Sequence, residues 1–134
     1  MAKLEQVEGI GKKYAGQLRK ADIRSTKSLL EKGATTKGRD EIARAAGISG
    51  KLILEWVNHV DLFRIKGVGE EYSDLLEEAG VDTVVELAQR NAANLHGAIL
   101  ETNAKKKLVR RPPSKKMVTD WVANAKKLPR KVYY

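Results

Sequence analysis

The chain contains no cysteine among its 134 residues. Disulfide bridges and thiolate metal sites are therefore excluded, which fits a reducing compartment. No hydrophobic run approaches the length of a membrane span, and the opening MAKLEQVEGIG lacks the apolar stretch of a signal peptide. We therefore expect a soluble, cytoplasmic protein with no membrane partner.

Aromatic residues are also scarce, at 5% of the chain. Proteins that bind single-stranded nucleic acids without sequence preference stack the bases on exposed aromatic side chains. Trp56 and Trp121 fall on apolar stripes of predicted helices, so we expect both to be buried in the core. The composition therefore disfavours a platform for single strands.

Acidic residues are nearly missing from the C-terminal part of the chain, although the net charge of the whole is only +9. Residues 1–62 contain twelve Lys and Arg against eight Asp and Glu, residues 63–104 three against eight, and residues 105–134 eleven against one. A surface that only confers solubility normally mixes both signs, whereas KKKLVRRPPSKK, Lys105 to Lys116, does not. This distribution predicts a polyanionic partner, most often nucleic acid.

The sequence contains an internal duplication. VEGIGKKYAGQLRKA at residues 7–21 is matched by IKGVGEEYSDLLEEA at residues 65–79. A second block, which includes Trp56 and Trp121, matches at a larger offset because the second copy holds extra residues around its basic run. Two copies are too few for a solenoid and favour two units about a pseudo-twofold axis. We predict a first basic unit at residues 1–62, a second unit with a basic insertion at 63–128, one core shared by both, and a loose tail at 129–134.

The hydrophobic periodicity is helical. Tyr14, Leu18 and Ala21 follow the i, i+4, i+7 spacing of one helix face, and their counterparts in the second copy do the same. Thr83 to Glu86 has the pattern of a capping box, and Ser25, Ser49 and Ser114 stand where helices should begin. No stretch alternates as a strand would. We therefore predict an all-α fold with about eight to ten short helices.

Each copy opens with a Gly-apolar-Gly step, Gly9 to Gly11 and Gly67 to Gly69. Such a step between two helices permits a tight hairpin, with the apolar residue turned back between them. The helix that follows then begins with free N–H groups, which form a ready anion site. A dinucleotide-binding fold is disfavoured because no strand precedes either step and the third glycine is missing.

The stretches VEGIGKKYA and IKGVGEEYS resemble helix-hairpin-helix motifs, and nearly the whole chain resembles the bacterial domain-of-unknown-function 4332 family with tandem hairpins. The resemblance implies that hairpin amides bind DNA phosphates across the minor groove without base readout. It also implies a monovalent cation on the carbonyls of some hairpins, and no other cofactor. The residues to which it assigns DNA contact are Gly9, Ile10, Gly11 and Lys12, and Gly67, Val68, Gly69 and Glu70.

The two copies differ in charge: Lys12 and Lys13 follow the first hairpin, and Glu70 and Glu71 the second. Glutamates in a first helical turn complement the helix dipole, whereas lysines there oppose it unless an anion lies in front of them. We therefore predict that the first copy binds phosphate and the second is mainly architectural. The further residues predicted to contact DNA are Lys13, Lys66, Lys105, Lys106, Lys107, Arg110, Arg111, Lys115 and Lys116.

The main prediction is a protein that binds duplex or branched DNA and works with other DNA-processing proteins. Three alternatives to it remain. Residues 39–60 mimic a helix-turn-helix that would read bases, but its exposed positions offer a poor set for base contacts. The acidic stretch at residues 69–82 suits a protein-interaction module. A glycosylase-like enzyme would use Lys13, but the required aspartate is missing, and His59 and His96 are isolated, so we predict a non-enzyme. RNA also stays open as a ligand.

Overall fold

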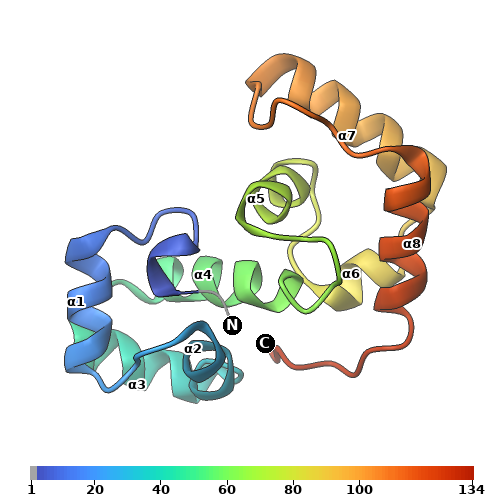
Figure 1. Ribbon diagram of the computed structural model, residues 1–134. Coiled ribbons are helices and arrows are strands. Elements are labelled where there is room, and N and C mark those ends of the chain that lie inside the picture. Colours follow the sequence, from blue (N-terminus) through green and yellow to red (C-terminus); the bar gives the residue numbers. More distant parts are fainter. Residues whose placement is uncertain (1–2) are drawn as a thin grey trace. The chain divides into compact units, whose positions relative to one another are not determined.

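The computed structural model describes residues 3–134, and every regular element in this range is helical (Figure 1). No strand occurs among these residues, which confirms the all-α prediction. A short 3-10 helix, η1, precedes eight α-helices in the described range. Their bounds are Leu4–Gln6 for η1, Lys12–Lys20 for α1, Thr26–Lys32 for α2, Thr36–Ala46 for α3, Gly50–Leu62 for α4, Glu70–Glu78 for α5, Val84–Ala88 for α6, Ala92–Lys106 for α7 and Lys115–Ala125 for α8.

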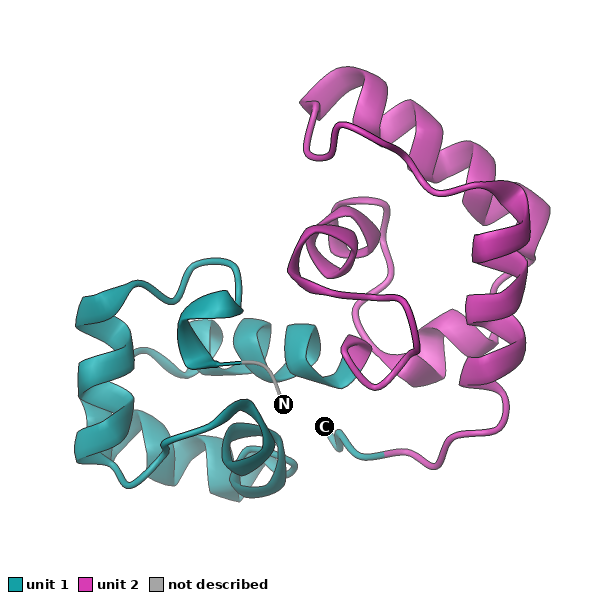
Figure 2. Ribbon diagram, in the orientation of Figure 1, with its two compact units in different colours: residues 1–61, 131–134 teal, residues 62–130 magenta. Residues whose placement is uncertain are grey.

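The chain forms two compact units (Figure 2). Unit 1 consists of Met1–Asp61 and Lys131–Tyr134, and unit 2 of Leu62–Arg130. Helix α5 begins at the repeat counterpart of the first residue of α1, and the same correspondence holds for α6 with α2 and for α8 with α4. The helix starts thus follow the sequence repeat, and within residues 3–134 each unit contains four α-helices in the same order.

Side-chain caps fix where the helices begin. Ser25 Oγ accepts the Ser28 N–H at 3.1 Å, and Ser114 Oγ accepts the Met117 N–H at 3.1 Å, as their positions in the sequence predict. Thr83 also caps its helix, but the predicted capping box is only half correct. The Glu86 carboxylate accepts the N–H of Asp82, one residue before the cap, at 3.0 Å.

In unit 1, α3 packs against α1 and α2, and η1 packs against α1. The helix faces predicted to be apolar are buried, with Leu18 and Ile53 fully enclosed and Trp56 only 1% exposed. Burial of these side chains supplies the main stabilisation of a helical unit of this size.

The C-terminal residues 131–134, expected to be loose, are packed on unit 1. Val132 is 2% exposed, and the Tyr133 N–H donates to the Ala34 carbonyl at 2.7 Å. The buried guanidinium of Arg39 donates to the Tyr133 carbonyl at 2.7 Å and lies 5.8 Å from the ring centre of Tyr134. A buried guanidinium must find acceptors, and the tail supplies one of them. The hydrogen bond to Arg39, the Tyr133 N–H and the burial of Val132 together hold the tail in place.

In unit 2, α8 packs against α6 and α7, and α5 packs against α7. Its core is an apolar cluster drawn from all four helices, including Leu76, Leu87, Ile99 and Trp121. Helix α7 has 15 residues against 11 in the corresponding α3, and it leads into the basic stretch. Across residues 3–134, no helix combines the length and the apolar composition that crossing a membrane requires.

Candidate nucleic-acid interface

The first Gly-apolar-Gly step forms a tight turn that ends at the start of α1. Gly9 has a φ of +91°, and a Cβ at this position would lie only 3.2 Å from Nε1 of Trp56. The left-handed backbone therefore favours glycine, and a larger residue would also displace the indole slightly. Ile10 is 3% exposed, so the apolar residue is turned into the core as predicted. The element before this turn is the three-residue η1 and not an α-helix, in contrast to the two-helix hairpin that the sequence suggests.

Gly11 has a different role from Gly9. It caps α1 with an extended backbone, and no atom of the described chain beyond its neighbours lies within 4 Å of the position that its Cβ would take. Neither φ nor packing therefore requires glycine here. No side chain hydrogen-bonds to the cap, so the first N–H groups of α1 face an open surface.

The second step repeats this geometry in unit 2. Gly67 has a φ of +90° and a Cβ position 3.3 Å from Nε1 of Trp121, while Gly69 caps α5 and is as open as Gly11. The supporting rings also correspond: the Tyr14 and Trp56 centroids are 5.1 Å apart at 57°, and those of Tyr72 and Trp121 are 5.2 Å apart at 55°. The two copies therefore share one backbone geometry and differ in charge.

The lysines of the first turn of α1 are exposed and unpaired. Within residues 3–134, neither Lys12 nor Lys13 forms an ion pair or a side-chain hydrogen bond. The nearby acid Glu5 is instead bound to Arg19 at 3.1 Å. A backbone hydrogen bond, and then Arg19, hold the pKa of Glu5 below its ordinary value. The start of α1 thus carries two exposed lysines that no acid of residues 3–134 pairs with, although the exposed Glu8 lies in the preceding turn.

Residues 105–111, here called the basic segment, are exposed at every basic position, as the sequence predicts. Their backbone is nevertheless fastened to the rest of unit 2. The Asn103 side chain donates to the Val109 carbonyl at 3.1 Å and accepts the Val109 N–H at 3.0 Å. The Tyr72 hydroxyl donates to the Arg111 carbonyl at 3.0 Å, and the His96 ring hydrogen-bonds to the Pro113 carbonyl at 3.1 Å. Sequence reasoning did not assign these three fastening residues to the site.

The basic segment lies beside the acidic helix α5. A groove of about 700 Å³ is lined by Glu71, Tyr72 and residues 107–111. Lys106 pairs with Glu78 of α5, and Lys105 pairs with Glu101 at 3.2 Å. The structure therefore brings cations next to the helix whose first turn holds Glu70 and Glu71 in place of lysines.

The remaining predicted cations in unit 2 are exposed. Lys66 directly precedes Gly67, and Lys115 and Lys116 occupy the first turn of α8. Lys116 pairs with Asp120 at 3.5 Å. Lys66 lies at the start of the second hairpin, and Lys115 and Lys116 lie at the start of α8, where Ser114 already accepts one of the first N–H groups.

A protein-family model described as "Domain of unknown function (DUF4332)" matches residues 8–128 of the chain. The chain belongs to this family. The DUF4332 match includes both Gly-apolar-Gly steps and the basic segment, and it confirms the family predicted from the sequence. A search of curated proteins and a search of solved structures give no match.

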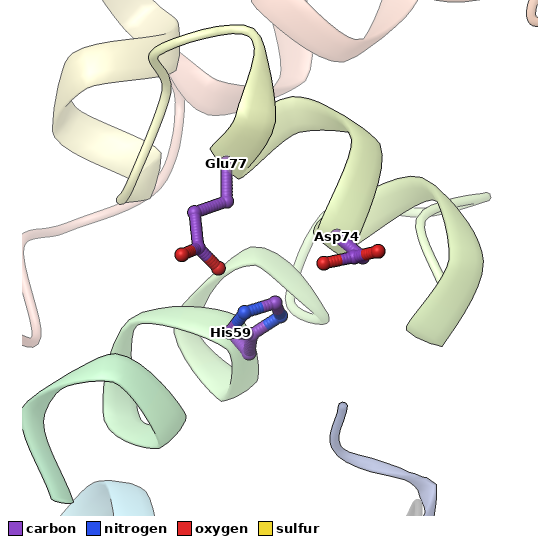
Figure 3. A group of neighbouring side chains, drawn as sticks. All are labelled: His59, Asp74 and Glu77. Atoms are coloured by element: carbon purple, nitrogen blue, oxygen red, sulfur yellow. The ribbon is translucent and has the colours of Figure 1, made fainter. Parts of the chain in front are cut away.

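The histidines of this DUF4332 chain are held by the fold. His59 lies on α4 of unit 1 and is 4% exposed, whereas His96 on α7 is half-buried and bound to a backbone carbonyl. Asp74 and Glu77 lie one turn apart on α5 of unit 2 (Figure 3). The fold therefore places His59 in the interior and leaves His96 only partly exposed.

The segment that mimics a helix-turn-helix has α3 and α4 joined at Gly47, whose φ is +69°. Helix α4 buries Ile53, Trp56 and Val57 in the core. Lys51 is exposed and Glu55 is half-buried. The first turns of α4 therefore offer few side chains suited to base contacts, as the sequence indicates.

Proposed function

We propose that this protein binds duplex DNA through the sugar-phosphate backbone, without reading the base sequence. The observation that carries the proposal is the open start of α1, where Gly11 leaves the backbone accessible and two unpaired lysines follow. Free N–H groups and the positive end of a helix dipole both attract a phosphate. The turn would thus act as the first half of a helix-hairpin-helix pair.

The free-energy cost of placing lysines in the first turn of α1 supports this proposal. Each lysine in a first helical turn opposes the dipole, at a cost of about 0.3–1 kcal/mol in exposed positions. In unit 2, glutamates occupy the corresponding turn of α5 and avoid that cost. The lysines of α1 are therefore unfavourable for the isolated helix but favourable for a bound phosphate.

Unit 2 contributes through its basic segment. Because Asn103, Tyr72 and His96 fasten the backbone of this segment and its flank, binding would order little more than the side chains. A surface arranged in advance loses less conformational entropy when the partner binds. We infer that the basic segment supplies the phosphate contacts that Glu70 and Glu71 cannot supply.

The structure offers little for base recognition. Trp56 and Trp121 are 1% and 3% exposed, so neither ring is available to stack on a base. The cations of the hairpin and of the basic segment suit phosphate contacts, which position a protein on DNA but carry no sequence information. Binding independent of sequence is the mode that this set of side chains favours.

The salt dependence of binding tests the proposal. If about five to eight cations contact phosphates, log K should fall with log salt at a slope of about −4 to −7. Fluorescence anisotropy with random duplexes of equal length would measure this slope, with single strands, four-way junctions and duplex RNA as comparisons. A slope near zero, or strong preference among the duplexes, would refute the proposal. A salt-insensitive oligomer without DNA affinity would instead support a protein-interaction module.

Charge reversal at the two hairpins tests the role of each copy. Lys12→Glu with Lys13→Glu should lower duplex affinity by about tenfold or more at low salt, because it removes two attractive charges and adds two repulsive ones. The melting temperature should hold or rise slightly, since glutamates suit a first helical turn.

The matched variant is Glu70→Lys with Glu71→Lys. If the second hairpin faces phosphate and lacks only the charge, this change should tighten binding. If the second copy is architectural, affinity should scarcely change. Intact affinity in the Lys12 and Lys13 variant would show that the first hairpin does not bind the backbone.

A further inference from the structure

Unit 2 has a second concave surface, formed where α7 begins and α8 ends. The groove measures about 470 Å³, and its walls include Arg90, Lys126 and Lys127. Its lining also includes the apolar residues Ala92 and Val122. No acidic residue lines it within the described chain, so the only charges in this groove are positive.

The three cations of this groove are unpaired in the described part of the chain. Within residues 3–134, none of their side chains forms an ion pair or a hydrogen bond. In the basic segment, by contrast, Lys105 and Lys106 are both paired with acids. Three like charges around one hollow repel one another, and an anion in the groove would relieve this repulsion.

Arg90 is the most enclosed of the three. It is half-buried, and its Nη1 lies 3.8 Å from the position that a Cβ of Gly80 would occupy. Its guanidinium nitrogens form no hydrogen bond within residues 3–134 and are not enclosed, so they are accessible to an anion in the groove. The planar guanidinium also suits bidentate contact with phosphate oxygens.

We propose that this groove binds a phosphate of the DNA backbone and forms a second anchor of unit 2, separate from the basic segment. The inference rests on the proposed function and adds a contact to it. The groove lies at the start of α7 and the basic segment at its end, and α7 has 15 residues. At about 1.5 Å per residue the two anchors are about 20 Å apart, or roughly six base pairs along a duplex.

The test is a variant with Arg90→Gln, Lys126→Gln and Lys127→Gln. Its matched control removes three exposed, unpaired lysines of unit 1, with Lys20→Gln, Lys27→Gln and Lys37→Gln. Both variants lose the same net charge. Affinity for a short random duplex would be measured by fluorescence anisotropy over a series of salt concentrations, with circular dichroism as the check on folding.

We expect the groove variant to reduce the magnitude of the salt slope by about 1, the contribution of one bound phosphate, and the control to leave it nearly unchanged. Equal effects of the two variants would overturn the groove as a site, because net charge alone would then explain the loss. If the unmodified protein does not bind the duplex at all, the proposed function itself fails. Should Arg90→Gln disturb the fold, the Lys126→Gln and Lys127→Gln pair gives the same test, with an expected change of at most about 1.

Discussion

Replacing all five cations of the basic segment by glutamine should weaken duplex binding by roughly two orders of magnitude or more at about 0.1 M salt. Each phosphate contact contributes a slope of about 0.9 in log K against log salt, so five contacts account for a change of about 4 to 5. Anisotropy at several salt concentrations would show both the weaker binding and the shallower slope. The change affects the residues Lys105, Lys106, Lys107, Arg110 and Arg111.

The same variant should keep its fold. Its two lost ion pairs, Lys105 with Glu101 and Lys106 with Glu78, are largely exposed, and such pairs contribute about 0–1 kcal/mol each. The hydrogen bonds that fasten the segment involve its backbone and remain available. Helical content and melting temperature should therefore change little.

Two outcomes would contradict this prediction. Loss of the fold would mean that the five side chains stabilise unit 2, and unchanged binding would mean that the segment does not contact DNA. A control with Arg110→Lys and Arg111→Lys keeps the charge and should bind within a few-fold of the unmodified protein. This control separates the effect of charge from that of any change in shape.

The helices could be predicted from the sequence because their signals are local. The spacing of Tyr14, Leu18 and Ala21 reports one helix face, and caps such as Ser25 and Ser114 report where helices begin. The two offsets of the sequence repeat also reappear between the helix starts of the two units. None of these features depends on contacts between residues distant in the chain.

The contacts that fasten the tail and the basic segment could not be predicted in this way. Arg39 and Tyr133 are 94 residues apart, and Tyr72 and Arg111 are 39 apart. In each pair a side chain donates to a backbone carbonyl, and every residue has such a carbonyl. The pattern of residue types therefore carries no signal of the pairing, and the prediction of a loose tail was wrong for residues 131–134.

Two further features could not be predicted from the sequence: the different roles of the two glycines in each turn, and the second cationic groove. Gly9 and Gly11 are both glycines of the same short turn, and the sequence does not distinguish their roles. Only Gly9 has a positive φ and lies against Trp56. Arg90 is distant in the chain from Lys126, so nothing in the sequence shows that they share a groove. The basic residues from Lys105 to Lys116, by contrast, could be recognised from the sequence because they lie close together in the chain.

Truncating Trp56 to alanine should destabilise the protein by roughly 3–5 kcal/mol, as for other large buried aromatic side chains. The indole is 1% exposed, its Nε1 lies beside Gly9, and its ring centre is 5.1 Å from that of Tyr14. Removal would leave a cavity behind the first hairpin as well as removing apolar contact. Trp121→Ala should have an effect of similar size, because its contacts with Gly67 and Tyr72 correspond.

Urea unfolding followed by circular dichroism would measure both losses, with Trp56→Phe as a milder control that keeps an aromatic ring. Each single variant retains one tryptophan, whose fluorescence reports on its own unit. Since the indole supports the turn before α1, Trp56→Ala should also weaken DNA binding, but only together with the loss of stability. Full stability with weakened DNA binding would instead place Trp56 on the contact surface, because a buried aromatic ring cannot be removed without energetic cost.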